Sequence, residues 1–200
     1  MTGYVEDLRS ILSELDLSGV TLVGHSVGGM ISLLAALAVP DRVERLVLIG
    51  TSPRYLNDDD YTGGFTRADI DQLLGTIESN YLAWAEATAP AAMANPDQPE
   101  LADELLHSFR KVDPEIALRF ARATFLLDHR ADLARVRLPT LVMQCKEDVL
   151  VPMSASDYLH QHIPGSELVI LEGATGHFPH MSAPAATIAA IRQFVDGVAT

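Results

Sequence analysis

The 200 residues are 48% hydrophobic, which is enough to bury one sizeable core and predicts one domain with at most an insertion. The net charge of −13 argues against nucleic acid as a partner, because the 14 Lys and Arg residues form no clustered basic face. A single cysteine excludes an internal disulfide framework, and no apolar run reaches membrane-spanning length. We therefore predict a cytoplasmic protein without membrane contact.

Predicted strands alternate with helices along most of the chain. Apolar residues at helical spacing predict a first helix from about Val5 to Leu15, and a last helix from about Pro184. Between them, short apolar runs predict strands that are covered on both faces, at residues 20–23, 43–49, 140–145 and 168–171. This alternation is typical of an α/β fold with a parallel sheet. Cys145 lies in the third run, so we expect it to be buried.

The region between the second and third predicted strands has a different pattern. Residues 53–64 are polar and turn-rich, and residues 66–129 show only helical segments. Their predicted starts are Thr66 with Asp69, Ser79 or Asn80, Asp97 with Pro99, and Asp113 with Pro114. A helical insertion over the carboxyl ends of parallel strands predicts a lid above a pocket. We divide the chain into a core segment (1–53), a four-helix lid (54–135) and a second core segment (136–200).

Ser26 stands in the pattern Gly24-His25-Ser26-Val27-Gly28, directly after the first predicted strand and before a helix. In this setting the pattern is typical of a nucleophile elbow, a sharp turn that holds a serine hydroxyl clear of the sheet. We expect Gly24 and Gly28 to permit the strained turn because they lack side chains. The amide of Val27, at the start of the helix, is then placed to bind the oxyanion that forms when Ser26 attacks a carbonyl.

A nucleophilic serine needs a base, and the base needs a third group that fixes its tautomer. Asp148 follows the third predicted strand and His177 follows the fourth, so both would lie at the same sheet edge as Ser26. Glu147 is the competing acid, but its side chain would point away from that of its neighbour. His25 lies too close to the serine along the backbone to act as the base, and we expect it to border the pocket.

The remaining histidines raise the alternative of a zinc site. His180 follows His177 by three residues, and His160 and His162 share a predicted helix. The sequence has neither a His-Glu-x-x-His helix nor paired cysteines, so we predict no metal and no cofactor. Aromatic residues that could line the pocket, or simply form the core of the lid, are Phe65, Tyr81, Trp84, Phe109, Phe120 and Phe125.

Longer motifs make the sequence resemble a known family over almost its full length. These motifs are Val23-Gly24-His25-Ser26-Val27-Gly28, Ser52-Pro53-Arg54-Tyr55-Leu56-Asn57-Asp58, Asn80-Tyr81-Leu82-Ala83-Trp84, Asp128-His129-Arg130 with Asp132-Leu133, and Gly176-His177-Phe178-Pro179-His180-Met181-Ser182. The family is that of the small α/β-hydrolases, which includes the bacterial stress regulator RsbQ and the plant strigolactone and karrikin receptors.

The resemblance implies an α/β-hydrolase fold with a V-shaped four-helix lid and a catalytic triad of Ser26, Asp148 and His177. It implies small esters or butenolide-type lactones as substrates, and a pocket that includes His25, Trp84 and Phe125. A regulatory protein partner in a stress-signalling pathway is a further implication.

In this family, additional strands and a loop that donates a second oxyanion amide precede the first helix of the pattern. The sequence therefore predicts a partial sheet that lacks the first strands and places the strand before Ser26 at an edge. Only the Val27 amide would bind the oxyanion, and losing one such donor costs about a hundred- to thousand-fold in rate. The sequence is then either an amino-terminally shortened version of a full hydrolase or one whose exposed edge is covered by a second copy, and for the second alternative we predict a homo-oligomer.

Two functions fit these observations. The first is a serine hydrolase that cleaves small carboxylic esters or lactones through an acyl-enzyme. The alternative is a ligand-sensing signalling module in which hydrolysis is slow or incidental and a protein partner transmits the signal. A haloalkane-type or peroxidase variant of the fold is a third and less favoured alternative, and dehalogenation would require an aspartate at position 26.

Overall fold

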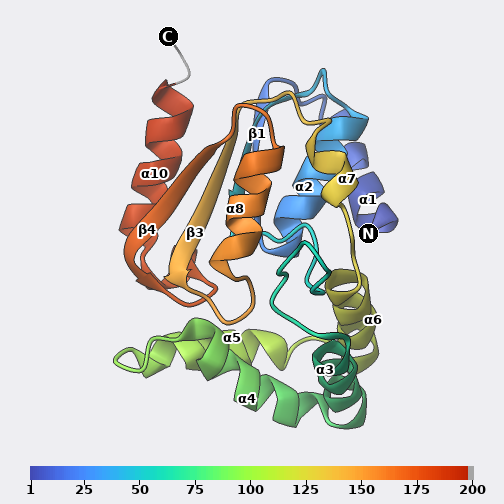
Figure 1. The fold of residues 1–200 in the computed structure, drawn as a ribbon, viewed down its shortest axis with the longest axis vertical. Coiled ribbons are helices and arrows are strands. Elements are labelled where there is room, and N and C mark those ends of the chain that lie inside the picture. The colour runs from blue at the N-terminus through green and yellow to red at the C-terminus, as the bar shows by residue number, and fades with distance from the viewer. Residues whose placement is uncertain (198–200) are drawn as a thin grey trace.

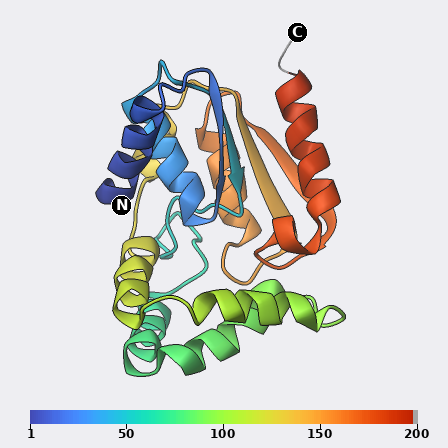
Figure 2. The ribbon, with the colours of Figure 1, turned by 180° about the vertical axis from the view of Figure 1, so that it is seen from behind.

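The computed structural model describes residues 1–197, in which a four-stranded parallel sheet is flanked by helices and further helices lie across one end (Figures 1 and 2). The strands lie side by side in chain order, and they are β1 (Val20–His25), β2 (Val43–Ile49), β3 (Thr140–Glu147) and β4 (Glu167–Thr175). Each neighbouring pair is parallel, so all four carboxyl ends meet at one edge of the sheet. The predicted parallel α/β architecture is confirmed.

Helices cover both faces of the sheet (Figure 1). On one side lie α1 (Thr2–Glu14), α2 (Val27–Ala38), the short α7 (Arg130–Leu133) and α8 (Met153–His162). The other face packs against α10 (Pro184–Gly197), which follows the short α9 (Pro179–Ser182). Alternation along β2 explains the two layers, since Leu46 and Leu48 belong to the first core and Val47 and Ile49 to the second. Cys145 is 2% exposed, as predicted.

Four of the helices between β2 and β3 lie at the carboxyl ends of the strands (Figures 1 and 2). They are α3 (Arg67–Ser79), α4 (Tyr81–Met93), α5 (Pro99–Phe109) and α6 (Pro114–Phe125), and we call them the helical segment. α3 packs on α6, and α4 packs on α5. The predicted caps at Thr66, Asn80 and Asp113 are confirmed, whereas Gln98 rather than Asp97 precedes α5. The division of the chain into core and lid segments stays a prediction.

β1 lies at the edge of the sheet, with β2 as its one strand partner among residues 1–197. Val23 of β1 is 51% exposed and Ile188 of α10 is 49% exposed. A hollow of about 340 Å³ lies beside them and is lined in part by His25, His180 and Ile191. Self-association through this edge stays a prediction.

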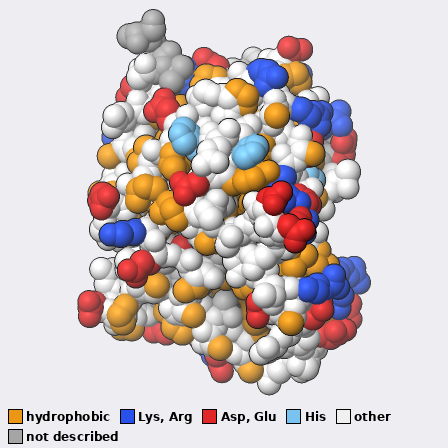
Figure 3. Space-filling model, viewed as in Figure 1, with side chains coloured by type: hydrophobic (Ala, Val, Ile, Leu, Met, Phe, Trp, Pro, Cys, Tyr) orange, Lys and Arg blue, Asp and Glu red, His pale blue; other side chains and the backbone are white. Residues whose placement is uncertain are grey.

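The surface charges are mixed. On the face drawn in Figure 3, the described Lys and Arg side chains lie among acidic ones and form no broad basic patch. Within residues 1–197, none of the helices combines the length and the apolar character that crossing a membrane requires.

Candidate active site

Ser26 sits between β1 and α2 on a strained turn. Its φ of 54° and ψ of −128° are unusual for a residue with a side chain, and its amide donates to the Ile49 carbonyl at 2.8 Å. A Cβ on Gly24 would lie 2.5 Å from the Gly28 carbonyl oxygen, so the expectation for Gly24 is confirmed. The expectation for Gly28 is wrong, because a Cβ there would meet no atom within 4 Å. Gly29 is the second crowded position, since a Cβ there would overlap the Thr51 hydroxyl.

The loops after β1, β3 and β4 bring three predicted residues together. Ser26 Oγ lies 2.8 Å from His177 Nε2, and His177 Nδ1 lies 2.8 Å from Asp148 Oδ2. The side chains of His177 and Asp148 are 3% and 2% exposed. A hydroxyl, an imidazole and a carboxylate in this order form a hydrogen-bonded chain that can move a proton away from the serine.

The surroundings of Asp148 fix the proton positions in this chain. Burial opposes ionisation of Asp148, but hydrogen bonds from His177 and from the amides of Leu150 (2.8 Å) and Val151 (3.1 Å) outweigh it and lower the pKa. An ionised carboxylate only accepts hydrogen bonds, so His177 Nδ1 carries its proton and Nε2 accepts the Ser26 hydroxyl. The competing acid, Glu147, is exposed, and Asp148 is the acid that contacts His177.

The His25 side chain contacts the backbone of the loop that carries His177, and not the Ser26 hydroxyl. Its Nε2 lies 2.7 Å from the carbonyl oxygen of His177, so this nitrogen donates. Burial and the neighbouring His177 lower the pKa of His25 to about 3, which keeps the ring neutral near physiological pH. His25 also lines the main cavity.

The carboxyl end of α4 packs directly on the loop that carries His177. The amide of His177 donates to the Ala92 carbonyl at 2.7 Å, and the Thr175 hydroxyl donates to the Ala94 carbonyl at 3.1 Å. Gly176 has a φ of +81°, and a Cβ there would overlap the Met93 carbonyl oxygen. The helical segment therefore positions the histidine as well as covering it.

An apolar cavity of about 810 Å³ opens above Ser26, between the sheet edge and the helical segment. Its lining includes Val27, His25, Trp84 and Phe125, all of which were predicted near the site, and contains no Asp, Glu, Lys or Arg. Trp84 stacks on Tyr81 with ring centroids 5.6 Å apart. Of the six aromatic candidates, only Phe65 lies outside the lining, where its ring contacts those of Tyr55 and Phe125.

Sequence reasoning missed Tyr55. Its hydroxyl lies 3.4 Å from Ser26 Oγ, its ring lies 5.0 Å from that of Phe125, and the residue is 1% exposed. Burial raises the pKa of Tyr55 to about 12, so the phenol stays protonated. Its place shortly after β2, at the sheet edge that carries Ser26, was the available signal.

The ring of His180 lies beside that of His25, with centroids 4.7 Å apart, whereas His160 and His162 lie on α8. His160 Nδ1 lies 3.1 Å from the Ser166 hydroxyl, and His162 Nδ1 donates to the Tyr158 carbonyl at 2.9 Å. In the part of the chain that the structure describes, no group of three or more His, Cys, Asp or Glu side chains could hold a metal ion.

The fold is that of an α/β hydrolase. The family model described as "alpha/beta hydrolase fold" matches residues 2–184, so the chain belongs to the α/β-hydrolase family. The predicted family, fold and hydrolase class are confirmed.

Two curated plant proteins and one solved structure illustrate the relationship. "Strigolactone esterase D14" from Arabidopsis thaliana is 40% identical over 182 residues, which cover 91% of this chain and 68% of the relative. "Karrikin insensitive 2 receptor IA" from Petunia hybrida is 35% identical over 196 residues, which cover 98% of this chain and 72% of the relative. A hydrolase from Oleispira antarctica superposes with a TM-score of 0.93 at 36% identity, covering 97% of this chain and 71% of that one.

Proposed function

We propose that this protein is a serine hydrolase that cleaves small carboxylic esters or lactones through an acyl-enzyme. The observation that carries the proposal is the chain of contacts from Ser26 Oγ to His177 Nε2 and from His177 Nδ1 to Asp148, both at 2.8 Å, at the base of an apolar cavity. The 40% identity to a protein named as a strigolactone esterase supports the same substrate class.

Each of the three residues has a role in the acyl transfer. As Ser26 Oγ attacks the carbonyl carbon, its proton moves to His177 Nε2, and Asp148 stabilises the resulting imidazolium. The Val27 amide, at the amino end of α2, donates to the oxyanion. His177 then protonates the leaving oxygen. A water molecule next gives a proton to His177 and attacks the acyl carbon, the bond from that carbon to Ser26 Oγ breaks, and His177 returns the proton to Oγ. This sequence of steps uses no cofactor.

The helical segment acts as the lid in this proposal, and His25, Trp84 and Phe125 form part of the substrate pocket. Since no Asp, Glu, Lys or Arg lines the cavity, a charged group on the substrate would lose its hydration without gaining an ionic partner. We therefore expect neutral substrates with a largely apolar body.

The direct test is Ser26→Ala, assayed with p-nitrophenyl acetate and p-nitrophenyl butyrate. We expect hydrolysis to fall by at least about a thousandfold, and a fluorophosphonate probe to label the wild-type protein but not the variant. The proposal fails if the wild-type protein is neither labelled nor able to turn over an ester, or if Ser26→Ala retains its activity.

A ligand-sensing module that acts through a protein partner is the second candidate. It is favoured by the contact of α4 with the His177 loop, because movement of the lid would then alter the site directly, and by the 35% identity to a protein named as a receptor. For a sensor, Ser26→Ala keeps a ligand-induced change in hydrogen exchange of α4, although it no longer hydrolyses the ligand. An unchanged exchange pattern in both proteins would count against a sensor.

Self-association through the edge of β1 belongs to the same proposal. Val23 and Ile188 are exposed beside the edge of β1, whose one strand partner among residues 1–197 is β2, and such an edge favours contact with a second copy. Sedimentation velocity should show a dimer that Val23→Lys weakens, and a monodisperse monomer would contradict it.

A further inference from the structure

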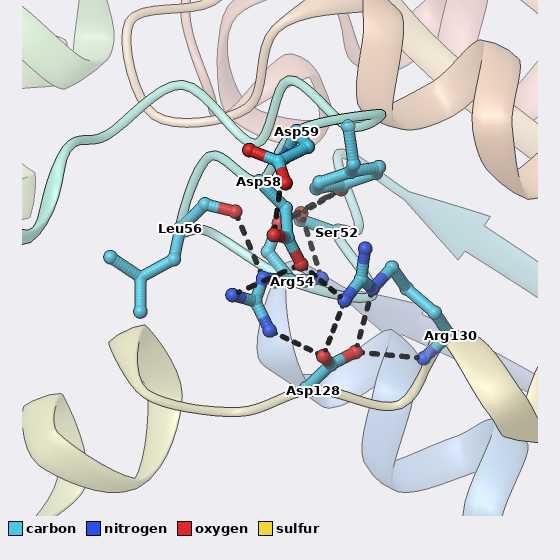
Figure 4. Close-up of polar contacts among 8 residues, drawn as sticks. Ser52, Arg54, Leu56, Asp58, Asp59, Asp128 and Arg130 are labelled. Atoms are coloured by element: carbon cyan, nitrogen blue, oxygen red, sulfur yellow. Dashed lines mark hydrogen bonds and ion pairs between the residues drawn. The ribbon is translucent and has the colours of Figure 1, made fainter.

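Two arginines and two aspartates join the two ends of the helical segment, and we call them the ion cluster (Figure 4). Asp128 lies between both guanidinium groups: it accepts from Arg54 Nη1, and from Arg130 Nη2 at 2.8 Å and Nε at 2.9 Å. Arg130 also donates to Asp58 at 2.9 Å. Since the chain enters the helical segment after Arg54 and leaves it before Asp128, the ion cluster fastens the entry to the exit.

Backbone contacts hold the same place. The amide of His129 donates to the Pro53 carbonyl at 2.9 Å, and Arg54 forms an antiparallel bridge with Asp128. The Arg54 carbonyl accepts from the hydroxyls of Ser52 at 2.6 Å and Tyr61 at 2.8 Å. Arg54 is thus fixed through both its backbone and its side chain.

Because Arg54 is fixed, the position of the next residue, Tyr55, is also restrained. The Tyr55 carbonyl accepts from the Phe65 amide at 3.1 Å, and its ring packs on Phe125. The hydroxyl is thereby placed 3.4 Å from Ser26 Oγ. Because the Ser26 hydroxyl donates to His177 Nε2, its oxygen can only accept from Tyr55, and so the phenol is the donor.

We propose that Tyr55 is a further catalytic residue, whose hydroxyl donates a hydrogen bond to the charged oxygen of the tetrahedral intermediate, and that Arg54 and Asp128 are positioning residues for it. This inference rests on the proposed hydrolase function. The charged oxygen is bonded to the same carbon as Ser26 Oγ, so a substrate whose carbonyl faces Tyr55 brings that oxygen within reach of the phenol. Tyr55 keeps its proton throughout and donates alongside the Val27 amide.

The first test is Tyr55→Phe, which keeps the ring packed on Phe125 and removes only the hydroxyl. We expect kcat for p-nitrophenyl acetate to fall by roughly a hundredfold, with KM nearly unchanged, because the lost contact forms in the transition state. The matched control is Tyr158→Phe on α8, outside the cavity lining. Its ring contacts those of His162 and Tyr61, and phenylalanine keeps both ring contacts, so kcat should be unchanged. A wild-type kcat in Tyr55→Phe would overturn the catalytic role.

The second test is a double-mutant cycle between Asp128→Asn and Tyr55→Phe. Asp128→Asn should lower kcat by about tenfold in the wild-type background and by less than about twofold in Tyr55→Phe, since the hydroxyl it positions is then absent. Asp128→Glu, which keeps the charge, should recover part of the loss. The matched control is Glu86→Gln, which breaks the Arg110–Glu86 ion pair (2.8 Å) between α4 and α5 and should not change kcat.

The outcomes separate this inference from the proposed function. An equal loss from Asp128→Asn in both backgrounds would show that the ion cluster only supports the fold, and would overturn the positioning role. Thermal unfolding of each variant identifies any that fails to fold, and if Asp128→Asn does, Arg54→Lys takes its place in the cycle. If Ser26→Ala abolishes turnover while Tyr55→Phe does not lower it, the present inference fails and the hydrolase proposal stands.

Discussion

The sheet edge and the helical segment build opposite sides of the cavity by different means. At the sheet edge, hydrogen bonds fix Ser26, His177 and Asp148 at 2.8 Å spacings. In the helical segment, aromatic rings such as Trp84 and Phe109 pack without hydrogen bonds between them, at a centroid distance of 5.4 Å. Short hydrogen bonds demand fixed geometry, whereas apolar packing tolerates changes of shape. Substitutions on the first side should therefore alter kcat, and those on the second should alter KM.

The largest effect is expected from Asp148→Asn, at the sheet edge. An amide can donate to His177 Nδ1 and favour the wrong tautomer, so that Nε2 no longer accepts the Ser26 proton, and kcat should fall by about 10⁴-fold. Steady-state hydrolysis of p-nitrophenyl butyrate measures it. The control is Glu147→Gln, the exposed neighbouring carboxylate, which should leave kcat unchanged. If kcat falls further in Glu147→Gln than in Asp148→Asn, then Glu147 and not Asp148 is the acid that supports His177.

Trp84→Ala tests the helical side of the comparison. Its ring lines the cavity, stacks on Tyr81 and contacts Phe109 at a tilt, so its loss should raise KM for p-nitrophenyl butyrate by about tenfold with little change in kcat. Leu82→Ala, at a 53% exposed position on the same helix, controls for changes in helix stability. If kcat falls by the same factor as KM rises, the helical segment affects kcat as well as KM, and the proposed difference between the two sides of the cavity is wrong.

The sequence predicts the sheet-edge side well because its determinants are local. Ser26, Asp148 and His177 each follow a predicted strand, and parallel strands bring their carboxyl ends together whatever the loops contain. Tyr55 and Gly29 escaped prediction because their importance depends on contacts across the fold, with Ser26 Oγ and with Thr51. The hydrogen bond from the His177 amide to the Ala92 carbonyl was not predicted for the same reason, since this bond forms only when α4 packs against the sheet edge.

The pH dependence of the free energy of unfolding tests the role of His25, whose neutral ring donates a hydrogen bond to the His177 carbonyl. Its pKa is lowered by burial and by His177 from an ordinary value of 6.5 to about 3, so between these values the unfolded chain takes up a proton that the folded chain does not. The free energy of unfolding should therefore fall as the pH drops from about 6.5 towards 4, by up to a few kcal/mol. The lowered pKa of His180 acts in the same direction.

His25→Gln separates this contribution from the others. Glutamine can still donate to the His177 carbonyl but does not titrate, so urea unfolding between pH 4 and pH 7 should show a flatter dependence than in the wild-type protein. His107→Gln, at an exposed position on α5, should leave the slope as it is. Equal slopes in all three proteins would mean that protonation of His25 is not coupled to unfolding.

The smallest effect is expected at Thr124, a polar residue on the apolar side of the cavity. It is 7% exposed, and its hydroxyl is buried without a hydrogen-bond partner among residues 1–197. Thr124→Val keeps the shape and removes the unpaired hydroxyl, so it should raise the free energy of unfolding by about 1 kcal/mol. Thr187→Val is the matched control. Thr187 is 3% exposed and its hydroxyl lies 3.0 Å from the carbonyl oxygens of Pro179 and Ala183, so its removal should lower the free energy of unfolding. Urea unfolding distinguishes the expected gain of stability in Thr124→Val from the expected loss in Thr187→Val. A loss of stability in Thr124→Val would show that its hydroxyl has a hydrogen-bond partner in solution. The helical side of the cavity would then also depend on a polar contact.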